Sequence, residues 1–100
     1  MRQPAPPFLT LEITEQFENA TAQLQKAQHN QLARRSVLLF DNPAHPSLRA
    51  HPIKPDKYYW EAYLNDSDRI IYVPEGSHLV LVDVVPHDGI GRYGKRPKKQ

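Results

Sequence analysis

Cysteine is absent from this chain of 100 residues. The absence excludes a disulfide framework and a thiolate zinc site, and it suits a protein of the reducing cytoplasm. Glycine is scarce, with four residues in the whole chain. Gly89 and Gly91 are too weak a match to a glycine-rich phosphate loop to predict nucleotide binding.

Long apolar runs are missing as well. No stretch approaches the roughly 18 residues of a membrane-spanning helix, and the start of the chain, MRQPAPP, lacks the apolar core of a secretory signal. Apolar residues make up 39% of the chain and charged residues 24%, which is ordinary for a soluble globular domain. We therefore expect one cytoplasmic domain over residues 8–93, after a poorly ordered, proline-rich lead-in over residues 1–7.

Charge is nearly balanced overall but unevenly distributed. The net charge is +2, from 13 basic and 11 acidic residues. Residues 92–100 hold five of the basic residues and no acidic one, so the rest of the chain has eight basic against eleven acidic side chains. A basic end of this kind indicates a polyanionic partner or a solvated tail. We assign residues 94–100 to a basic tail.

The first half of the chain has the pattern of a strand followed by helices. Residues 8–13 alternate apolar and polar side chains, which predicts a half-buried strand. Thr14 is suited to cap the N-terminus of a helix. Apolar residues at helical spacing then predict a helical hairpin over residues 14–28 and 31–41, with a break at His29–Asn30. One long kinked helix is the alternative.

The second half has the pattern of short strands joined by short turns. Residues 48–54 contain a proline and predict an edge strand or an irregular segment. Strands are expected over residues 58–64, 69–73 and 78–85, and such short connections favour an antiparallel meander. The last of these strands is apolar on both faces apart from Asp83, so we expect it inside the sheet.

Together these elements predict an α+β domain. An N-terminal strand and a helical hairpin are expected to pack on a small curled, mainly antiparallel sheet, in the order β-α-α-β-β-β-β. In the strand over residues 58–64, alternate side chains should face the core, namely Tyr58, Trp60, Ala62 and Leu64. The others, Tyr59, Glu61 and Tyr63, should face outward. We also assign Tyr72 to the core.

Five histidines are many for a chain of this length. The imidazole of histidine, with an ordinary pKa near 6.5, can transfer protons in both directions near neutral pH. The histidines lack the close pairing of a metal site, and no G-x-S-x-G motif or cysteine provides a nucleophile. We therefore expect no metal and no cofactor. His29, His45 and His78 are assigned no role, at a helix end, a turn and a strand start.

Histidine, arginine, lysine and tyrosine remain as the residues that could carry chemistry. They suit metal-free RNA cleavage, in which the 2′-hydroxyl attacks the neighbouring phosphate. A base takes the hydroxyl proton, an acid protonates the departing 5′ oxygen, and cations stabilise the charge that develops. Aromatic rings can stack on unpaired bases.

Residues from about 9 to 93 resemble the RelE/ParE superfamily of toxins from bacterial toxin–antitoxin pairs. The resemblance rests on the order of the elements and on three stretches, NPAHPSLRAHPIK, YYWEAYLNDSDRIIY and the ending HDGIGRY. It implies the fold described above. Members of the RelE branch cleave messenger RNA, usually on the ribosome, whereas the ParE branch inhibits DNA gyrase.

The resemblance also implies roles for individual residues. His51 stands where histidine-bearing members place a catalytic histidine, and Glu61 where some members use a carboxylate as base. Arg69 resembles an arginine that contacts the scissile phosphate, and His87 a C-terminal general acid or base. Tyr93 resembles a terminal aromatic residue that supports the 2′-hydroxyl or stacks a base, although it follows His87 at a longer spacing than in the family. The expected substrate-binding residues are Arg49, Lys54, Tyr63, Arg92, Lys95 and Arg96.

Each assignment has a purely structural alternative. Arg69 can pair with Glu61, Asp66 or Asp68 at the surface, and the histidine at the end of the last strand can bond a loop carbonyl. Tyr59 and Tyr63 are as suited to packing as to base stacking. The residues alone do not decide which group is the acid and which the base.

We predict from the sequence a cytoplasmic RelE-type toxin, a metal-independent endoribonuclease that acts on messenger RNA and is held silent in a complex with an antitoxin. One alternative is a ParE-type inhibitor of gyrase without catalysis. The other is a non-toxic module that binds RNA and leaves it intact.

Overall fold

A computed structural model of the chain describes residues 7–97. Its elements follow the predicted order, with two short 3₁₀ helices added. They are β1 (Thr10–Ile13), α1 (Glu15–Thr21), α2 (Lys26–Asp41), η1 (Pro46–Leu48), β2 (His51–Pro52), β3 (Trp60–Tyr63), β4 (Asp68–Glu75), β5 (His78–Pro86) and η2 (His87–Tyr93). Within the described range no helix has the length and apolar character needed to cross a membrane.

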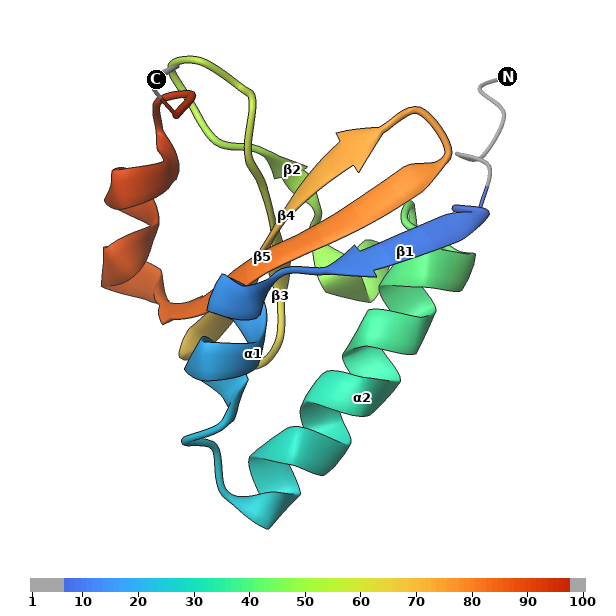
Figure 1. Cartoon of the computed structure of the whole chain (residues 1–100), viewed down its shortest axis with the longest axis vertical. Helices are drawn as coiled ribbons and strands as arrows, with labels where there is room; N and C mark the ends of the chain where they lie inside the picture. Colours follow the sequence, from blue (N-terminus) through green and yellow to red (C-terminus); the bar gives the residue numbers. More distant parts are fainter. Residues whose placement is uncertain (1–6, 98–100) are drawn as a thin grey trace.

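The five strands form one sheet in the order β1-β5-β4-β3-β2 (Figure 1). Strands β2 to β5 make the predicted antiparallel meander, and β1 adds to β5 in parallel. The α+β class and the mainly antiparallel sheet are therefore confirmed. Strand β5 lies between β1 and β4, as its apolar character predicted. Gly76 has φ of +60° in the turn that joins β4 to β5, a conformation that glycine adopts without steric cost.

The two predicted helices exist, but the predicted break between them is wrong. Thr14 caps α1 as expected, because its hydroxyl accepts a hydrogen bond from the backbone N–H of Phe17 at 3.1 Å. His29–Asn30 lies inside α2, where neither a proline nor a glycine interrupts the helix. The chain leaves α1 earlier, and Gln25 starts α2 in a reciprocal capping arrangement with Gln28.

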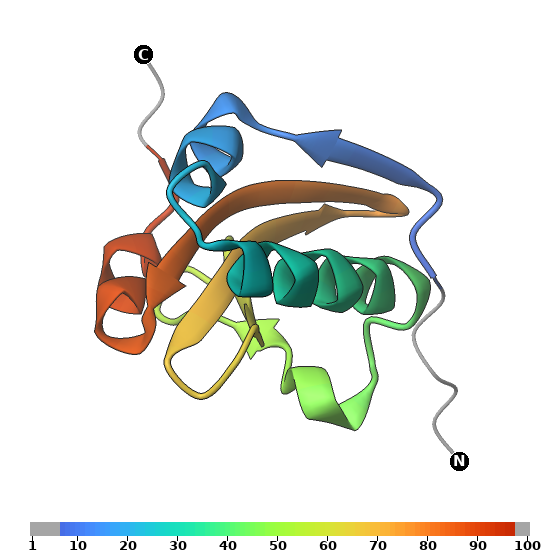
Figure 2. The ribbon, with the colours of Figure 1, turned by 90° about the horizontal axis from the view of Figure 1, so that it is seen from below.

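Both helices cover one face of the sheet and bury the larger part of the core (Figure 2). The buried side chains on this side include Phe17, Leu32, Leu39, Ala62, Leu64, Ile70, Tyr72, Leu79 and Leu81. Tyr72 is in the core as predicted, and Trp60 is half-buried against it.

The predicted N-terminal strand exists, but the prediction that it is half-buried is wrong. Leu9, Leu11 and Ile13 are 73%, 47% and 48% exposed. Strand β1 lies at the edge of the sheet, and the core holds Phe8 instead, whose N–H donates to the carbonyl of Phe40 at 2.9 Å. An alternating pattern predicts which side chains share a face but not whether that face is covered.

The opposite face of the sheet has an apolar cluster of its own, covered by η2 (red in Figures 1 and 2). Its buried members are Ile53, Ile71, Val73, Val80, Val82, Val85 and Tyr93. Glu61, expected to face solvent, is only 4% exposed. The alternation predicted for β3 is correct for Ala62 and Leu64, but the other face is buried too. Tyr58 precedes β3 and packs with this second cluster.

A β-bulge turns Asp83 toward η2. Ile71 pairs with Asp83 while Tyr72 pairs with Leu81, so Val82 is an extra residue in β5. The buried carboxylate of Asp83 accepts hydrogen bonds from the hydroxyl of Tyr93, from Nε2 of Gln16 at 3.1 Å and from the N–H of Val84 at 2.8 Å.

The hydroxyl of Tyr93 therefore joins η2 to β5, and Nε2 of Gln16, which also lies 2.6 Å from that hydroxyl, adds α1. The backbone beyond Tyr93 stays close to the sheet, since the N–H of Asp56 donates to the carbonyl of Gly94 at 2.9 Å. A Cβ on Gly94 would stand 2.7 Å from the carbonyl oxygen of Lys54, so this approach requires glycine. Residues 1–6 and 98–100 lie outside the described range, and the division into lead-in, domain and tail stays a prediction.

The Tyr93 hydroxyl predicts a pH-dependent stability. Burial, followed by the hydrogen bond to Asp83, raises the pKa of Tyr93 above its ordinary value of 10.0. Below pH 10 both folded and unfolded chains keep the proton; above it only the unfolded chain loses it, so stability falls. We expect Tyr93→Phe to lower the free energy of unfolding by about 1–3 kcal/mol at pH 8, and the deficit to shrink by about 1 kcal/mol at pH 11. Urea unfolding at the two pH values measures both quantities.

Tyr58→Phe is the matched control, because the hydroxyl of Tyr58 has no hydrogen-bond partner within residues 7–97. It should change the free energy of unfolding by no more than about 0.5 kcal/mol. A Tyr93→Phe variant as stable as the wild type at pH 8 would show that the bond to Asp83 stabilises nothing.

Candidate functional site

His51 and Glu61 face each other across strands β2 and β3, where they are register partners. Nδ1 of His51 lies 2.7 Å from the backbone carbonyl of Arg49, and Nε2 lies 3.3 Å from a carboxylate oxygen of Glu61. Because a carbonyl only accepts, the geometry assigns a hydrogen to Nδ1, and Nε2 is the nitrogen that can gain or lose a proton. The imidazole is open to solvent, with 54% of the side chain exposed.

Arg69 holds Glu61 from the other side. Its Nε lies 3.5 Å from the second carboxylate oxygen of Glu61, which is an ionic contact but too poorly aligned for a hydrogen bond. Nη1 of Arg69 donates to the carbonyls of Asn65, Asp66 and Asp68 at 3.0, 3.3 and 3.0 Å. The arginine thus ties the buried carboxylate to the turn between β3 and β4.

Arg69 is also stacked and inaccessible. Its guanidinium carbon lies 3.7 Å from the ring centre of Tyr63, and only 4% of its side chain is exposed. Of its two sequence interpretations, the pairing with Glu61 is the one that this geometry supports, and the pair is buried rather than superficial. A direct contact between Arg69 and a substrate phosphate would require the turn to open.

A groove runs past His51 and Glu61 to η2. It has a volume of about 410 Å³ and is lined by His51, Pro52, Ile53, Lys54, Glu61, Ile90 and Gly91. Strand β2 and the loop after it form one wall, and η2 forms the other. Lys54 and His51 therefore line the same groove.

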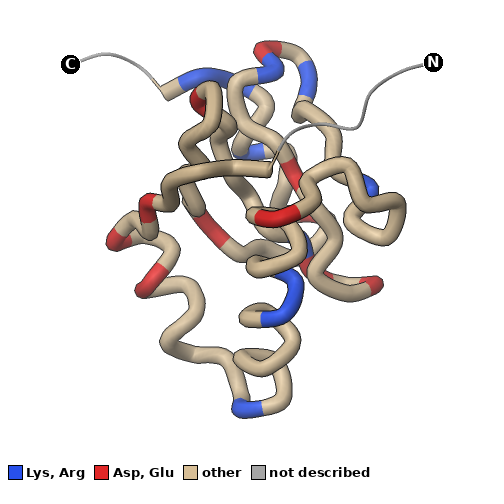
Figure 3. The backbone as a smooth tube through the Cα atoms, turned by 90° about the vertical axis from the view of Figure 1, so that its right-hand side faces the viewer, with Lys and Arg blue, Asp and Glu red and all other residues tan. Residues whose placement is uncertain are grey.

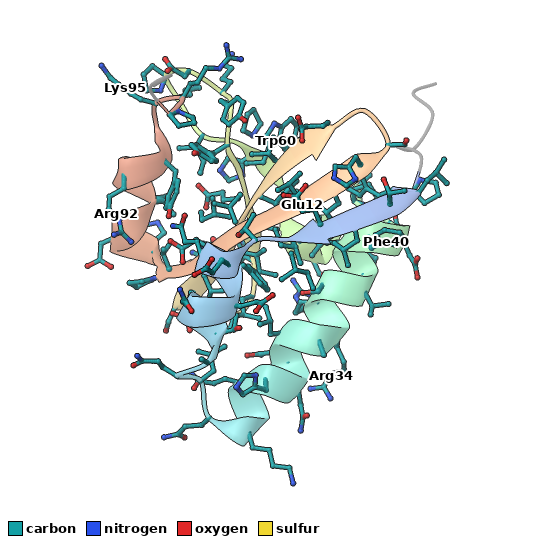
Figure 4. All side chains as sticks on the ribbon, in the orientation of Figure 1. Glu12, Arg34, Phe40, Trp60, Arg92 and Lys95 are labelled. Carbon is teal, nitrogen blue, oxygen red and sulfur yellow. The ribbon has the colours of Figure 1, made fainter. Side chains whose placement is uncertain are left out.

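Further cations stand around this end of the molecule. In Figure 3 several Lys and Arg positions gather near the C-terminal end of the described chain. Arg92 lies on η2 and points away from the sheet, with 70% of its side chain exposed, and Lys95 follows it (Figure 4). Arg96 is exposed and its guanidinium lies 5.0 Å from the ring centre of Tyr58. Arg34 on α2 lies far from this group in the same view.

The remaining two predicted catalytic residues stand apart from the His51 pair. His87 is the first residue of η2; it is exposed, and its backbone N–H donates to the carbonyl of Ser67 at 2.8 Å. Within residues 7–97 no hydrogen bond or ion pair joins its side chain to His51, Glu61 or Arg69. Tyr93 ends η2, and its hydroxyl is engaged by Asp83. The structure thus brings together three of the five residues.

Arg49, Tyr63 and Arg35 extend the site along the sheet. Arg49 has φ of +47°, in the left-handed region that is uncommon for a side chain of this size. Its guanidinium carbon lies 4.9 Å from the ring centre of Tyr63. Sequence reasoning missed Arg35 and Asp83 as parts of this region. The sequence does mark Asp83, because it is the one acidic residue in an otherwise apolar strand. It does not mark Arg35, because the position of Arg35 depends on how α2 packs.

This arrangement suits proton transfer at the edge of a groove that Lys54 also lines. A carboxylate next to an imidazolium acts as its counter-ion and orients the ring. In the described part of the chain, no three acidic, histidine or cysteine side chains are grouped closely enough to hold a metal ion. The chemistry that these residues can supply is acid–base chemistry on an anionic substrate.

No protein-family model matches the chain, and no curated protein sequence does. Solved structures do match. The structure of the E. coli DinJ-YafQ toxin-antitoxin complex gives a TM-score of 0.67 at 21% identity, covering 80% of this chain and 93% of the other. An archaeal RelE-RelB complex from Pyrococcus horikoshii OT3 gives 0.64 at 18% identity, covering 77% and 92%. The YoeB/ParE toxin from Agrobacterium tumefaciens gives 0.64 at 15% identity, covering 79% and 99%.

These likenesses extend over about four-fifths of the chain and over nearly the whole length of the matched chains. At such low identity they concern the backbone and not the site. These backbone likenesses are consistent with the element order and the mixed five-stranded sheet of this structure. The resemblance found in the sequence is thereby confirmed at the level of structure: the chain has the fold of the RelE/ParE-type toxins.

Proposed function

We propose that this chain is the toxin of a toxin–antitoxin pair and that it is a metal-independent endoribonuclease acting on messenger RNA. The observation that carries the proposal is the exposed imidazole of His51, paired with the buried Glu61 in a groove that Lys54 also lines. The toxin fold supports the biological setting, and the groove supports the substrate class.

The proton-transfer role falls to His51 rather than to Glu61. Glu61 is 4% exposed, and its two oxygens face Nε2 of His51 and Nε of Arg69. Both oxygens of Glu61 thus already have partners, so we assign the carboxylate to positioning the imidazole. Nε2 of His51, whose side chain is exposed, would turn from Glu61 to the substrate and exchange a proton with either the attacking 2′-hydroxyl or the departing 5′ oxygen.

His87 is the second proton-transfer group of the proposal. It is exposed at the start of η2, the element that forms the far wall of the groove. Cleavage needs one group to take a proton and another to give one. The two histidines are both accessible, and η2, which begins with His87, contributes Ile90 and Gly91 to the groove that His51 lines.

The charge of the reacting phosphate is stabilised by accessible cations. Arg49, Lys54, Arg92, Lys95 and Arg96 are all exposed, and we assign phosphate contacts to them. We leave Arg69 out of this group because it is buried, and Tyr93 because its hydroxyl is bonded to Asp83. These two are positioning residues, which hold Glu61 and η2.

A cognate antitoxin is the proposed protein partner. The matched E. coli toxin is described in a complex with its antitoxin, and we extend that arrangement to this chain as a hetero-oligomer in the cytoplasm. The target would be messenger RNA engaged on the ribosome. An antitoxin that covers both the groove and the start of η2 would silence cleavage, because it would block both histidines.

A ParE-type inhibitor of gyrase is the second candidate, since a structural match carries that name. The paired His51 and Glu61 argue against it, because a binding protein needs no oriented imidazole. A module that binds RNA without cutting it would also leave this pair unused.

Induced expression tests the proposal directly. We expect the wild-type chain to arrest growth and to produce new 5′ ends in a reporter message, detected by primer extension. His51→Ala should reduce the cleavage rate by about 100-fold or more, since general acid–base catalysis contributes that much. His87→Ala should act in the same direction.

His29→Ala is the matched control, an exposed histidine on α2, the helix that packs on the other face of the sheet. It should cleave as the wild type does. Growth arrest without new 5′ ends would favour the gyrase inhibitor, and soluble folded protein without arrest would refute the toxin.

The salt dependence of RNA binding tests whether RNA phosphates contact Lys54 in the groove. Binding is measured in a His51→Ala background, in which cleavage is slowed. Each phosphate contact contributes about 0.7 to the slope of log binding constant against log salt concentration. We expect Lys54→Ala to reduce the slope by about that amount. Lys26→Ala, an exposed lysine at the start of α2, should leave it unchanged. Equal slopes for the two variants would place the RNA elsewhere.

A further inference from the structure

A second pocket lies next to the groove, between α2, η1 and the turn from β3 to β4. It has a volume of about 340 Å³, within the range of small-ligand sites. Its lining is mostly polar and consists of Gln31, Arg35, Ser47, Arg49, Tyr63, Leu64, Asn65 and Asp66. We call it the Tyr63 pocket.

Arg35 makes one wall of the Tyr63 pocket rigid and positive. Its Nε donates to the carbonyl of Tyr63 at 3.1 Å, and its two terminal nitrogens donate to the hydroxyl and the carbonyl of Ser47 at 3.0 and 2.7 Å. With Arg49 the pocket has two cations against the single carboxylate of Asp66. An anionic ligand is therefore favoured over a cationic one.

The ring of Tyr63 is held firmly by one arginine and loosely by another. Arg69 stacks on it at 3.7 Å and is buried. Arg49 approaches the ring at 4.9 Å, is exposed, and reaches the hydroxyl of Tyr63 only at 3.5 Å. Of the two arginines, Arg49 makes the looser and more exposed contact, so it is the one that a planar ligand would displace from the ring. Nucleobases are planar and stack on both tyrosine rings and guanidinium planes.

Arg49 also connects this pocket to the proton-transfer groove. Its backbone carbonyl accepts the hydrogen bond from His51, while its guanidinium stands at Tyr63. On the neighbouring strand, Tyr63 follows Glu61 by two residues and points to the same face, about 6.6 Å further along. One nucleotide of an extended single strand covers that distance.

We infer that the Tyr63 pocket binds the base of the nucleotide next to the phosphodiester that is cleaved at His51. The base stacks on Tyr63, Arg49 closes over it or contacts its phosphate, and the amides of Gln31 and Asn65 with the carboxylate of Asp66 meet its polar edge. The inference rests on the proposed function and extends it from acid–base chemistry to the choice of substrate.

Backbone amide NMR of the full chain with nucleoside 5′-monophosphates tests this site without any cleavage. We expect at least one of the four ribonucleotides to shift the amide signals of Ser47, Arg49 and residues 63–66. Ribose 5-phosphate, which lacks the base, should bind at least tenfold more weakly, because a stacked base adds about that factor or more.

Two substitutions and a matched control make the test specific. Tyr63→Leu should weaken nucleotide binding about tenfold or more, and Tyr63→Phe, which keeps the ring, should retain it. Tyr58→Leu is the control, because Tyr58 has its own arginine, Arg96, at 5.0 Å but lines none of the pockets described above. The amide spectrum of each variant reports whether it is folded.

Equal binding of ribose 5-phosphate would reduce the pocket to an anion site and overturn the inference. Shifts confined to the groove around His51, or no shifts, would overturn it as well. These results stand apart from the proposed function, because message cleavage by the wild type is measured separately. A chain that cleaves RNA but ignores mononucleotides at Tyr63 would lose only this inference.

Discussion

A buried carboxylate, Glu61, organises the functional half of this structure. An ionised side chain that is almost fully removed from water is costly unless partners neutralise it. Glu61 has two such partners: Arg69, which is itself buried, and His51, which is exposed. The interaction therefore ties an accessible imidazole to the interior of the sheet. Arg69 is in turn held in place because three backbone carbonyls, in and next to the turn between β3 and β4, accept hydrogen bonds from its guanidinium.

A second buried carboxylate, Asp83, lies on the same face of the sheet but has different partners. Glu61 and Asp83 both pair with Ile71, one from each neighbouring strand. The hydroxyl of Tyr93 donates a hydrogen bond to Asp83, and this bond holds η2 over the apolar cluster. Glu61 is left facing a groove. One face of the sheet is thus divided into a half that η2 covers and a half that lines a groove.

The order of elements and the meander follow from the sequence because the turns are short and clearly marked. The burial errors have physical causes. Leu9, Leu11 and Ile13 alternate as a half-buried strand does, but alternation carries no information about an edge strand that the helices leave uncovered. Glu61 was expected outside because nothing in the ending HDGIGRY indicates a 3₁₀ helix that folds back over the sheet.

The candidate site was predictable in composition but not in geometry. His51, Glu61 and Arg69 were all singled out by the resemblance, yet their contact depends on a register between β3 and a strand of only two residues. No local pattern specifies such a register. Arg35 was missed because its role arises from the packing of α2 against η1 and β3, which involves residues distant in sequence.

We propose that Glu61 acts only through His51. A double-mutant cycle on the rate of message cleavage tests this dependence, with the folded state of each variant verified by circular dichroism. Glu61→Gln should slow the wild-type chain but cause no further loss in the His51→Ala background, because its one catalytic partner is already gone. If the two losses multiply instead, Glu61 contributes to the reaction independently of His51.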